Sequence, residues 1–121
     1  MKKILLIEDN ADMRENIAEI LQMANYNVVT AENGKAGVDM AQREKPDLII
    51  CDIMMPELDG YETMQAVRAL PGFERLPIIS LTAKAMKGDR ERSIASGASD
   101  YITKPVDTDQ LLSLMRVWLY H

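Results

Sequence analysis

Acidic residues follow two short apolar runs at widely separated points of the chain. Glu8 and Asp9 come directly after the run Ile4–Ile7, and Asp52 comes after Leu48–Cys51. If the fold brings these carboxylates together, they repel one another by about 4 kcal/mol per pair at an effective dielectric of about 20. A divalent cation with oxygen ligands relieves that repulsion, and Mg²⁺ suits a few carboxylates together with water and phosphate. The pattern therefore indicates a magnesium site.

Two further polar residues follow apolar runs later in the chain. Thr82 comes after Pro77–Leu81, and Lys104 lies shortly after Ile102. The threonine hydroxyl and the lysine ammonium are donors suited to phosphate oxygens. Aspartate is a known nucleophile that forms an aspartyl-phosphate, and phosphoryl transfer depends mostly on positioning and charge neutralisation. The set predicts a phosphoryl-transfer site in which a carboxylate is the nucleophile.

Short apolar runs alternate along the chain with segments whose apolar residues recur at helical spacing. The runs are too short for helices and predict strands. These strands are Ile4–Ile7, Val28–Ala31, Leu48–Cys51, Pro77–Leu81 and a short segment around Ile102. Such alternation predicts an α/β fold, a five-stranded parallel sheet with helices on both faces. Ligands of these sheets bind at the carboxyl ends of the strands, so the polar residues are expected to meet at one edge.

Polar residues with short side chains mark where the predicted helices begin. They are Asn10, Asn33, Asp59 and Asp107, the last forming a capping-box-like start with Gln110. The helix predicted over 86–96 carries only Met86 and Ile94 as large apolar residues and is otherwise crowded with charge. A helix anchored this lightly can shift and expose a partner surface.

The composition predicts a single domain over residues 1–121. The chain has a net charge of −5 and 47% hydrophobic residues. No cluster of lysine and arginine forms a basic face, so we expect no direct nucleic-acid binding. No stretch is apolar for long enough to span a bilayer, so we expect no membrane contact. Cys51 is the one cysteine, which excludes an internal disulfide and fits a reducing cytoplasm.

Several of these segments form one larger pattern. They are Leu5–Asn10, Leu48–Pro56, Asp59–Gly60, Leu81–Lys84 and Asp100–Pro105. In this order and at these spacings they resemble the receiver domain of two-component response regulators, and the resemblance covers essentially the whole chain. It implies a flavodoxin-like, doubly wound (βα)5 fold with strand order 2-1-3-4-5. It also implies a function in phosphorelay signal transduction.

The resemblance implies a metal site around a phosphoacceptor. Asp52 would take the phosphoryl group. Mg²⁺ would be held by Glu8, Asp9, Asp52 and the backbone carbonyl of Met54, with Mn²⁺ as an alternative ion.

The resemblance also assigns roles to residues at the ends of the last two strands. Thr82 and Lys104 would contact the phosphoryl group, and Tyr101 would be an aromatic switch that turns inward as Thr82 moves. The Lys104–Pro105 peptide bond would be cis.

Two positions in similar receivers influence attack of water on the phosphorylated aspartate. Here they are Met54 and Lys84. Because an apolar methionine cannot orient water by hydrogen bonding, we expect slow self-dephosphorylation. The chain would then catalyse its own phosphorylation without being a conventional turnover enzyme.

The partners implied by the resemblance are a histidine kinase or phosphotransfer protein as donor, and a downstream protein target. The target would bind through the fourth helix, the fifth strand and the last helix, on a monomer or a phosphorylation-dependent dimer.

Three alternatives stay open at this point. The segments Leu81–Arg90 and Lys104–Asp107 resemble receivers attached to hybrid histidine kinases, so the chain could be a module of a larger protein. An aspartate-nucleophile, Mg²⁺-dependent phosphatase usually needs a second carboxylate where Met54 stands. A pseudo-receiver that never takes phosphate conflicts with intact Asp52, Thr82 and Lys104.

Overall fold

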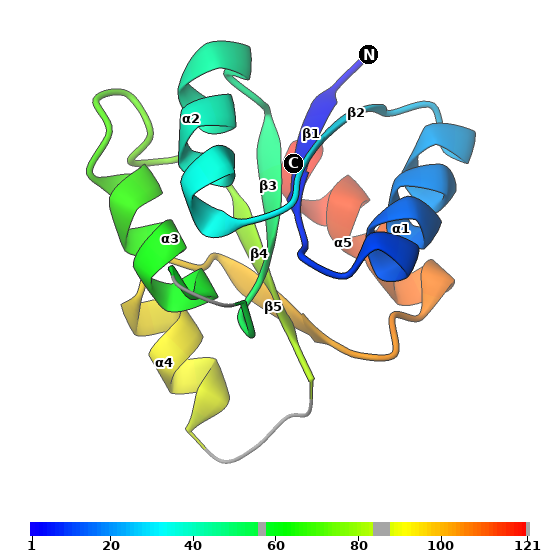
Figure 1. Ribbon diagram of the computed structural model, residues 1–121. Helices are drawn as coiled ribbons and strands as arrows, with labels where there is room; N and C mark the ends of the chain where they lie inside the picture. The colour runs from blue at the N-terminus through cyan, green and yellow to red at the C-terminus, as the bar shows by residue number, and fades with distance from the viewer. Residues whose placement is uncertain (56–57, 84–87, 121) are drawn as a thin grey trace.

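A five-stranded parallel sheet with the order β2-β1-β3-β4-β5 forms the centre of the molecule (Figure 1). The computed structural model describes residues 1–55, 58–83 and 88–120. The strands are β1 (Lys3–Ile7), β2 (Asn27–Ala31), β3 (Leu48–Asp52), β4 (Ile78–Thr82) and β5 (Asp100–Thr103). The predicted fold class and strand order are therefore confirmed.

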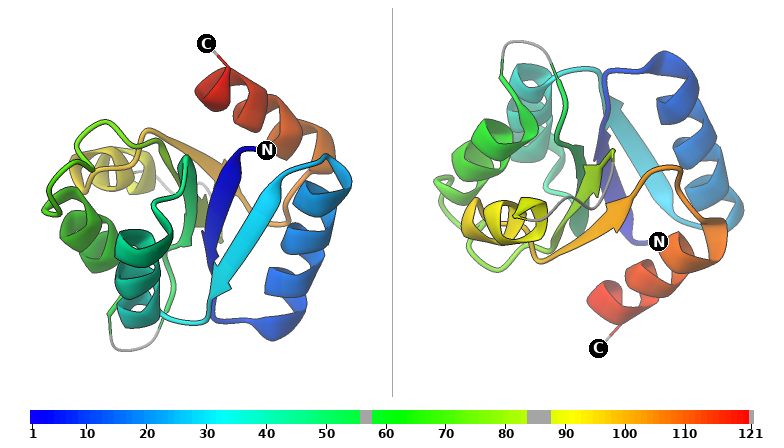
Figure 2. Two further views of the ribbon diagram at one scale, coloured as in Figure 1. Left: turned by 90° about the horizontal axis from the view of Figure 1, so that it is seen from above. Right: turned by 90° about the horizontal axis from the view of Figure 1, so that it is seen from below.

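Helices cover both faces of the sheet (Figure 2). On one face lie α1 (Ala11–Met23) and α5 (Thr108–Leu119). On the other lie α2 (Gly34–Glu44), α3 (Gly60–Arg68) and α4 (Asp89–Ala95). Among the described residues, no helix has the length and hydropathy needed to cross a bilayer.

Side chains that alternate along the strands divide the core into two clusters. In β1, Leu5 and Ile7 pack on the side of α2 and α3, whereas Ile4 and Leu6 pack on the side of α1 and α5. All residues of β3 and β4 are buried. Burial on both faces explains why these strands read as continuous apolar runs instead of alternating ones.

Two strands end one residue later than the sequence predicts. Asp52 pairs with Leu81, and Thr82 pairs with Thr103, so both polar residues belong to the strands that they were expected to follow. At its start, β4 excludes Pro77, which has no N–H for the ladder. The Pro77 carbonyl still accepts a hydrogen bond from the backbone N–H of Ile49 at 2.9 Å.

All four residues predicted to begin helices are N-caps in the structure. The side chains of Asn10, Asn33, Asp59 and Asp107 each accept a backbone N–H from the first turn. The complete capping box is at α3, where Glu62 also accepts the N–H of Asp59. At α5 the structure shows only the bond from the Gln110 backbone to Asp107.

The helix predicted over 86–96 is described as α4, from Asp89 to Ala95, and Met86 lies outside the described residues. Gly97, with φ of 118°, follows its last turn, as expected for a helix stop. Among the methionines, Met55, Met64 and Met115 are buried in the core, whereas Met1, Met23 and Met54 are exposed.

Candidate functional site

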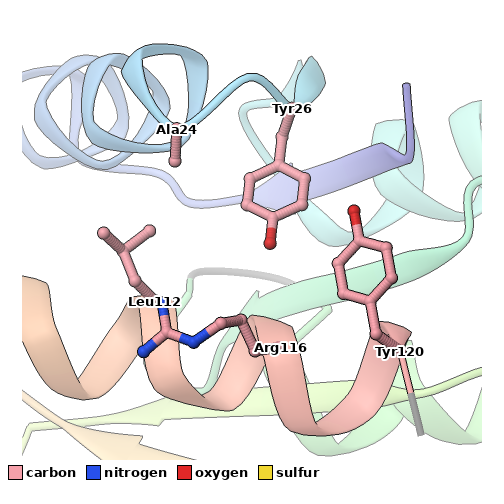
Figure 3. A pocket seen from close by; sticks show the side chains of 5 residues that line it. All are labelled: Ala24, Tyr26, Leu112, Arg116 and Tyr120. Carbon is pink, nitrogen blue, oxygen red and sulfur yellow. The ribbon is translucent and has the colours of Figure 1, made fainter.

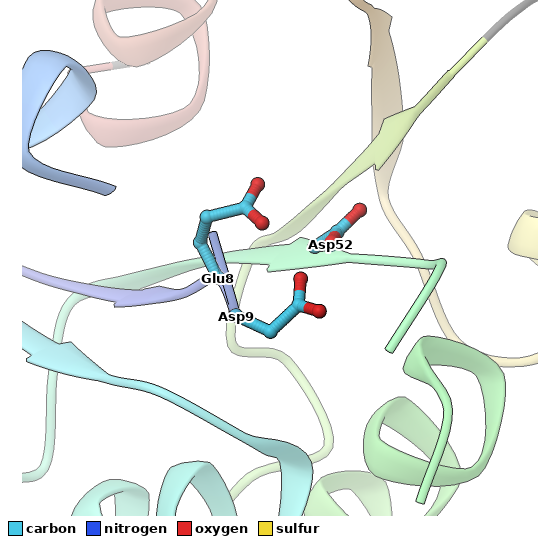
Figure 4. A group of neighbouring side chains, drawn as sticks. All are labelled: Glu8, Asp9 and Asp52. Atoms are coloured by element: carbon cyan, nitrogen blue, oxygen red, sulfur yellow. The ribbon is translucent and has the colours of Figure 1, made fainter. Parts of the chain in front are cut away.

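Three carboxylates meet at the carboxyl ends of the neighbouring strands β1 and β3 (Figure 4). Glu8 and Asp9 follow β1, and Asp52 ends the neighbouring β3. Each offers an oxygen within 4.8 Å of the others. Glu8 and Asp52 are almost fully buried, while Asp9 is exposed. The fold therefore brings together the three acidic residues that the sequence singles out.

Lys104 reaches into this cluster from the end of β5. Its Nζ lies 2.9 Å from Asp52 Oδ1, to which it donates a hydrogen bond, and 3.3 Å from Glu8 Oε1. Burial on its own lowers the pKa of Lys104, but the hydrogen bond and charge of Asp52, with the charge of Glu8, raise it above the ordinary value. Lys104 is thus held as an ammonium group beside two carboxylates.

The single ammonium leaves part of the acidic cluster unsatisfied. Glu8 Oε1 and Asp52 Oδ2 are buried and accept no hydrogen bond from the described residues. The pKa of Glu8 is raised from 4.5 to about 7, first by burial and also by Asp52, against the lowering effects of the Asn10 N–H and the Lys104 charge. Buried oxygens without a donor are costly, and a divalent cation satisfies them. The donor set therefore fits Mg²⁺.

Two hydrogen bonds that the sequence does not predict stabilise the loop after β1. The backbone N–H of Asn10 donates to Glu8 Oε2 at 3.1 Å, and Arg14 Nη1 donates to the Glu8 carbonyl at 2.8 Å. Arg14 lies in the first turns of α1 and is part of no sequence motif. Its bond to the Glu8 carbonyl is therefore visible only in the folded structure.

Gly60 allows α3 to begin directly against the end of β3. Its N–H donates to the Ile53 carbonyl at 2.9 Å. A Cβ at this position would collide with the carbonyl oxygen of Asp52. The pair Asp59–Gly60 was part of the sequence pattern. The pair alone does not predict that Gly60 packs against the backbone of Asp52.

Thr82 is the last residue of β4, whereas Tyr101 is the second residue of β5. The Thr82 hydroxyl is buried and has no hydrogen-bond partner among the described residues. Tyr101 is half-buried, and the guanidinium carbon of Arg90 lies 5.8 Å from the centre of its ring. In the described part of the chain, neither side chain is bonded to Asp52.

Three other predicted positions complete the site. Met54 has an exposed side chain, and its backbone N–H donates to Asp52 Oδ1 at 3.3 Å. The Lys104–Pro105 peptide bond is cis. Lys84 lies outside the described residues.

A separate surface pocket of about 530 Å³ lies at the opposite edge of the sheet, between the turn after α1 and the last turns of α5 (Figure 3). Tyr26, Arg116 and Tyr120 line it with Ala24 and Leu112. None of these lining residues belongs to the acidic site, so the pocket is separate from it.

Comparisons with known sequences agree with this geometry. A family model for the response regulator receiver domain matches residues 4–116. The chain is 30% identical to the polar-differentiation response regulator DivK of Brucella anthropi, with 98% of this chain and 96% of that protein covered. It is 39% identical to the hybrid signal transduction histidine kinase D of Dictyostelium discoideum over 91% of this chain, but spans only 7% of that kinase.

A solved structure shares the fold and contains a metal ion. It is the receiver domain of the sensor histidine kinase PA1611 from Pseudomonas aeruginosa, with a magnesium ion coordinated in its active site cleft. The TM-score is 0.92 at 36% identity, covering 99% of this chain and 98% of that one.

Proposed function

The chain belongs to the response regulator receiver domain family, and we propose that it takes a phosphoryl group onto Asp52 from a phosphohistidine. Phosphorelay signalling is the function of this family, whose members bind Mg²⁺ at an acidic site and interact with histidine kinases or phosphotransfer proteins. The observation that carries the proposal is the position of Asp52. Its carboxylate is buried between two other acids and bonded directly to the Lys104 ammonium.

The chain's own residues supply the nucleophile and the charged groups for phosphoryl transfer. An Asp52 carboxylate oxygen attacks phosphorus while the nitrogen–phosphorus bond of the donor breaks, and the leaving imidazole keeps the electron pair and takes up a proton. Mg²⁺, bound by Glu8, Asp9, Asp52 and the Met54 carbonyl, would neutralise charge on the phosphoryl oxygens. Mn²⁺ could take the same ligands.

We propose that residues in and next to the last two strands respond to phosphorylation of Asp52. Lys104 would exchange its bond to the Asp52 carboxylate for one to a phosphoryl oxygen. The Thr82 hydroxyl, which has no partner among the described residues, would donate to another. Movement of Thr82 would then let Tyr101 turn inward.

Those movements would change the surface formed by α4, β5 and α5, where we place the downstream protein target. We propose a monomer or a phosphorylation-dependent dimer in the cytoplasm, without direct contact with nucleic acid. The buried, reduced Cys51 supports the cytoplasmic setting.

The likeness to histidine-kinase receivers also supports a role as one module of a longer hybrid kinase. The chemistry at Asp52 is the same in both cases. The phosphatase alternative has no support in the site, because Met54 offers no carboxylate for a general acid.

Incubation with Mg²⁺ and acetyl phosphate, followed by intact-mass measurement, tests the proposal. Wild type should gain the mass of one phosphoryl group, and Asp52→Asn should gain none. Asp12→Asn, which removes an exposed carboxylate from the first turn of α1, is the matched control and should be modified like wild type. Modification of Asp52→Asn, or an unmodified wild type with every donor tried, would contradict the proposal.

A further inference from the structure

Helix α4 is held in place by little apolar packing. Among its described side chains only Ser93 is buried, and the Ser93 hydroxyl has no hydrogen-bond partner in the described part of the chain. Ile94, its large aliphatic residue, is 47% exposed. Most helical stability in proteins comes from burying an apolar face. Because α4 buries little apolar surface, packing on the sheet explains its position only in part.

Arginines from and around α4 provide more specific attachments. At the end of the helix, Nε and Nη2 of Arg68 both donate to the Gly97 carbonyl, at 2.9 and 2.7 Å. Within the helix, the guanidinium carbon of Arg92 lies 4.0 Å from the centre of the Tyr61 ring on α3. This second contact is a close cation–π stack. Helix α4 is thus fixed at its carboxyl end by Arg68 and joined to α3 by Arg92.

Tyr61 is in turn fixed relative to the phosphoacceptor. It follows Gly60, whose N–H donates to the Ile53 carbonyl and which approaches the Asp52 backbone too closely to carry a Cβ. Tyr61 itself is buried. Arg92 and Tyr61 also line a pocket of about 460 Å³ together with Ile53, Met54, Met55 and Asp59. The cation–π stack therefore connects α4 to the backbone beside Asp52.

We propose that Arg92 and Tyr61 are positioning residues, whose contact holds α4 to α3 while Lys104 is bonded to the free carboxylate of Asp52. Release of the contact accompanies phosphorylation. The proposal rests on the proposed function of Asp52. A contact present in only one of two arrangements shifts their equilibrium by its own free energy, so its removal favours the phosphorylated arrangement.

Binding of beryllofluoride, a phosphoryl analogue, in the presence of Mg²⁺ tests the proposal by titration calorimetry. Arg92→Gln and Tyr61→Leu should each lower the half-saturating concentration about two- to fivefold, the range that corresponds to an exposed cation–π contact. The double variant should show no larger effect than either single one, because both remove the same contact. Amide hydrogen exchange should become faster in α4.

Two variants separate the contact from charge and from general damage. Tyr61→Phe keeps the aromatic face and should bind beryllofluoride like wild type. Arg75→Gln removes an exposed positive charge elsewhere and should also have no effect. Arg92 is exposed, so Arg92→Gln is expected to fold even if Tyr61→Leu does not.

Unchanged or weaker binding by Arg92→Gln would overturn the proposal, as would additive effects in the double variant or a Tyr61→Phe protein that behaves like Tyr61→Leu. These outcomes leave Asp52 as phosphoacceptor, provided that wild type binds and Asp52→Asn does not. A wild type that binds no beryllofluoride would overturn the function and this inference together.

Discussion

At the residue scale, the side chain of Met54 lies beside the proposed phosphoacceptor, where we predict that it affects access of water. It is 69% exposed, while its backbone N–H is bonded to Asp52. A thioether is at most a weak hydrogen-bond acceptor and orients water poorly. We therefore expect phosphorylated Asp52 to decay slowly, over minutes or longer, and Met54→Gln to shorten its lifetime severalfold by offering an amide to water.

The decay is measured as loss of the phosphoryl mass after the donor is removed. Met23→Gln makes the same change at another exposed methionine, on α1, and should leave the lifetime unchanged. Wild-type decay within seconds would defeat the expectation.

At the element scale, the approach of α3 to β3 depends on Gly60. A methyl group there would meet the backbone of Asp52 and Ile53, which cannot move aside as a flexible side chain can. We expect Gly60→Ala to lower the free energy of unfolding by about 1–3 kcal/mol, the usual cost of overpacking, and to slow phosphorylation by displacing Asp52.

Denaturant unfolding and the rate of modification by acetyl phosphate provide the two measurements. Asp59→Ala removes the adjacent helix cap and should cost about 1 kcal/mol while leaving the rate of Asp52 modification nearly unchanged. If Gly60→Ala matched wild type in both stability and rate, the close approach would have no energetic consequence.

At the scale of the whole molecule, the raised pKa of Glu8 couples stability to pH and to Mg²⁺. The folded protein binds the Glu8 proton more tightly than the unfolded chain, with a pKa of about 7 against 4.5. This stabilisation is fully present below about pH 4.5 and is lost as the pH rises through about 7. Without Mg²⁺, the free energy of unfolding should fall across that interval.

Because the proposed Mg²⁺ ligand is the charged Glu8 carboxylate, Mg²⁺ should stabilise the protein more at pH 8 than at pH 5. Denaturant unfolding at both pH values, with and without Mg²⁺, measures the effect. Glu8→Gln carries no titrating proton at this position and should flatten the pH dependence. Equal stabilisation by Mg²⁺ at both pH values would contradict the coupling.

The order of the elements and the grouping of the acidic residues follow from local sequence patterns. Short aliphatic runs such as Ile4–Ile7 are too short for helices, and capping residues such as Asn10 and Asp59 mark where helices begin. Parallel strands place their carboxyl ends at one edge, so Glu8, Asp9 and Asp52 could be grouped before their positions were known. The observed ends of β3 and β4 lie one residue beyond the predicted ends. Backbone pairing with a neighbouring strand, as between Thr82 and Thr103, cannot be recognised from the sequence of one strand.

The chain's sequence by itself determined which acidic residues meet and at which edge of the sheet they do so. Only the tertiary structure decided how those groups are tuned. The bond from Lys104 to Asp52, the raised pKa of Glu8 and the stack of Arg92 on Tyr61 each join residues from separate elements. Such contacts depend on side-chain direction, burial and distances of a few ångströms, which residue type and spacing do not encode.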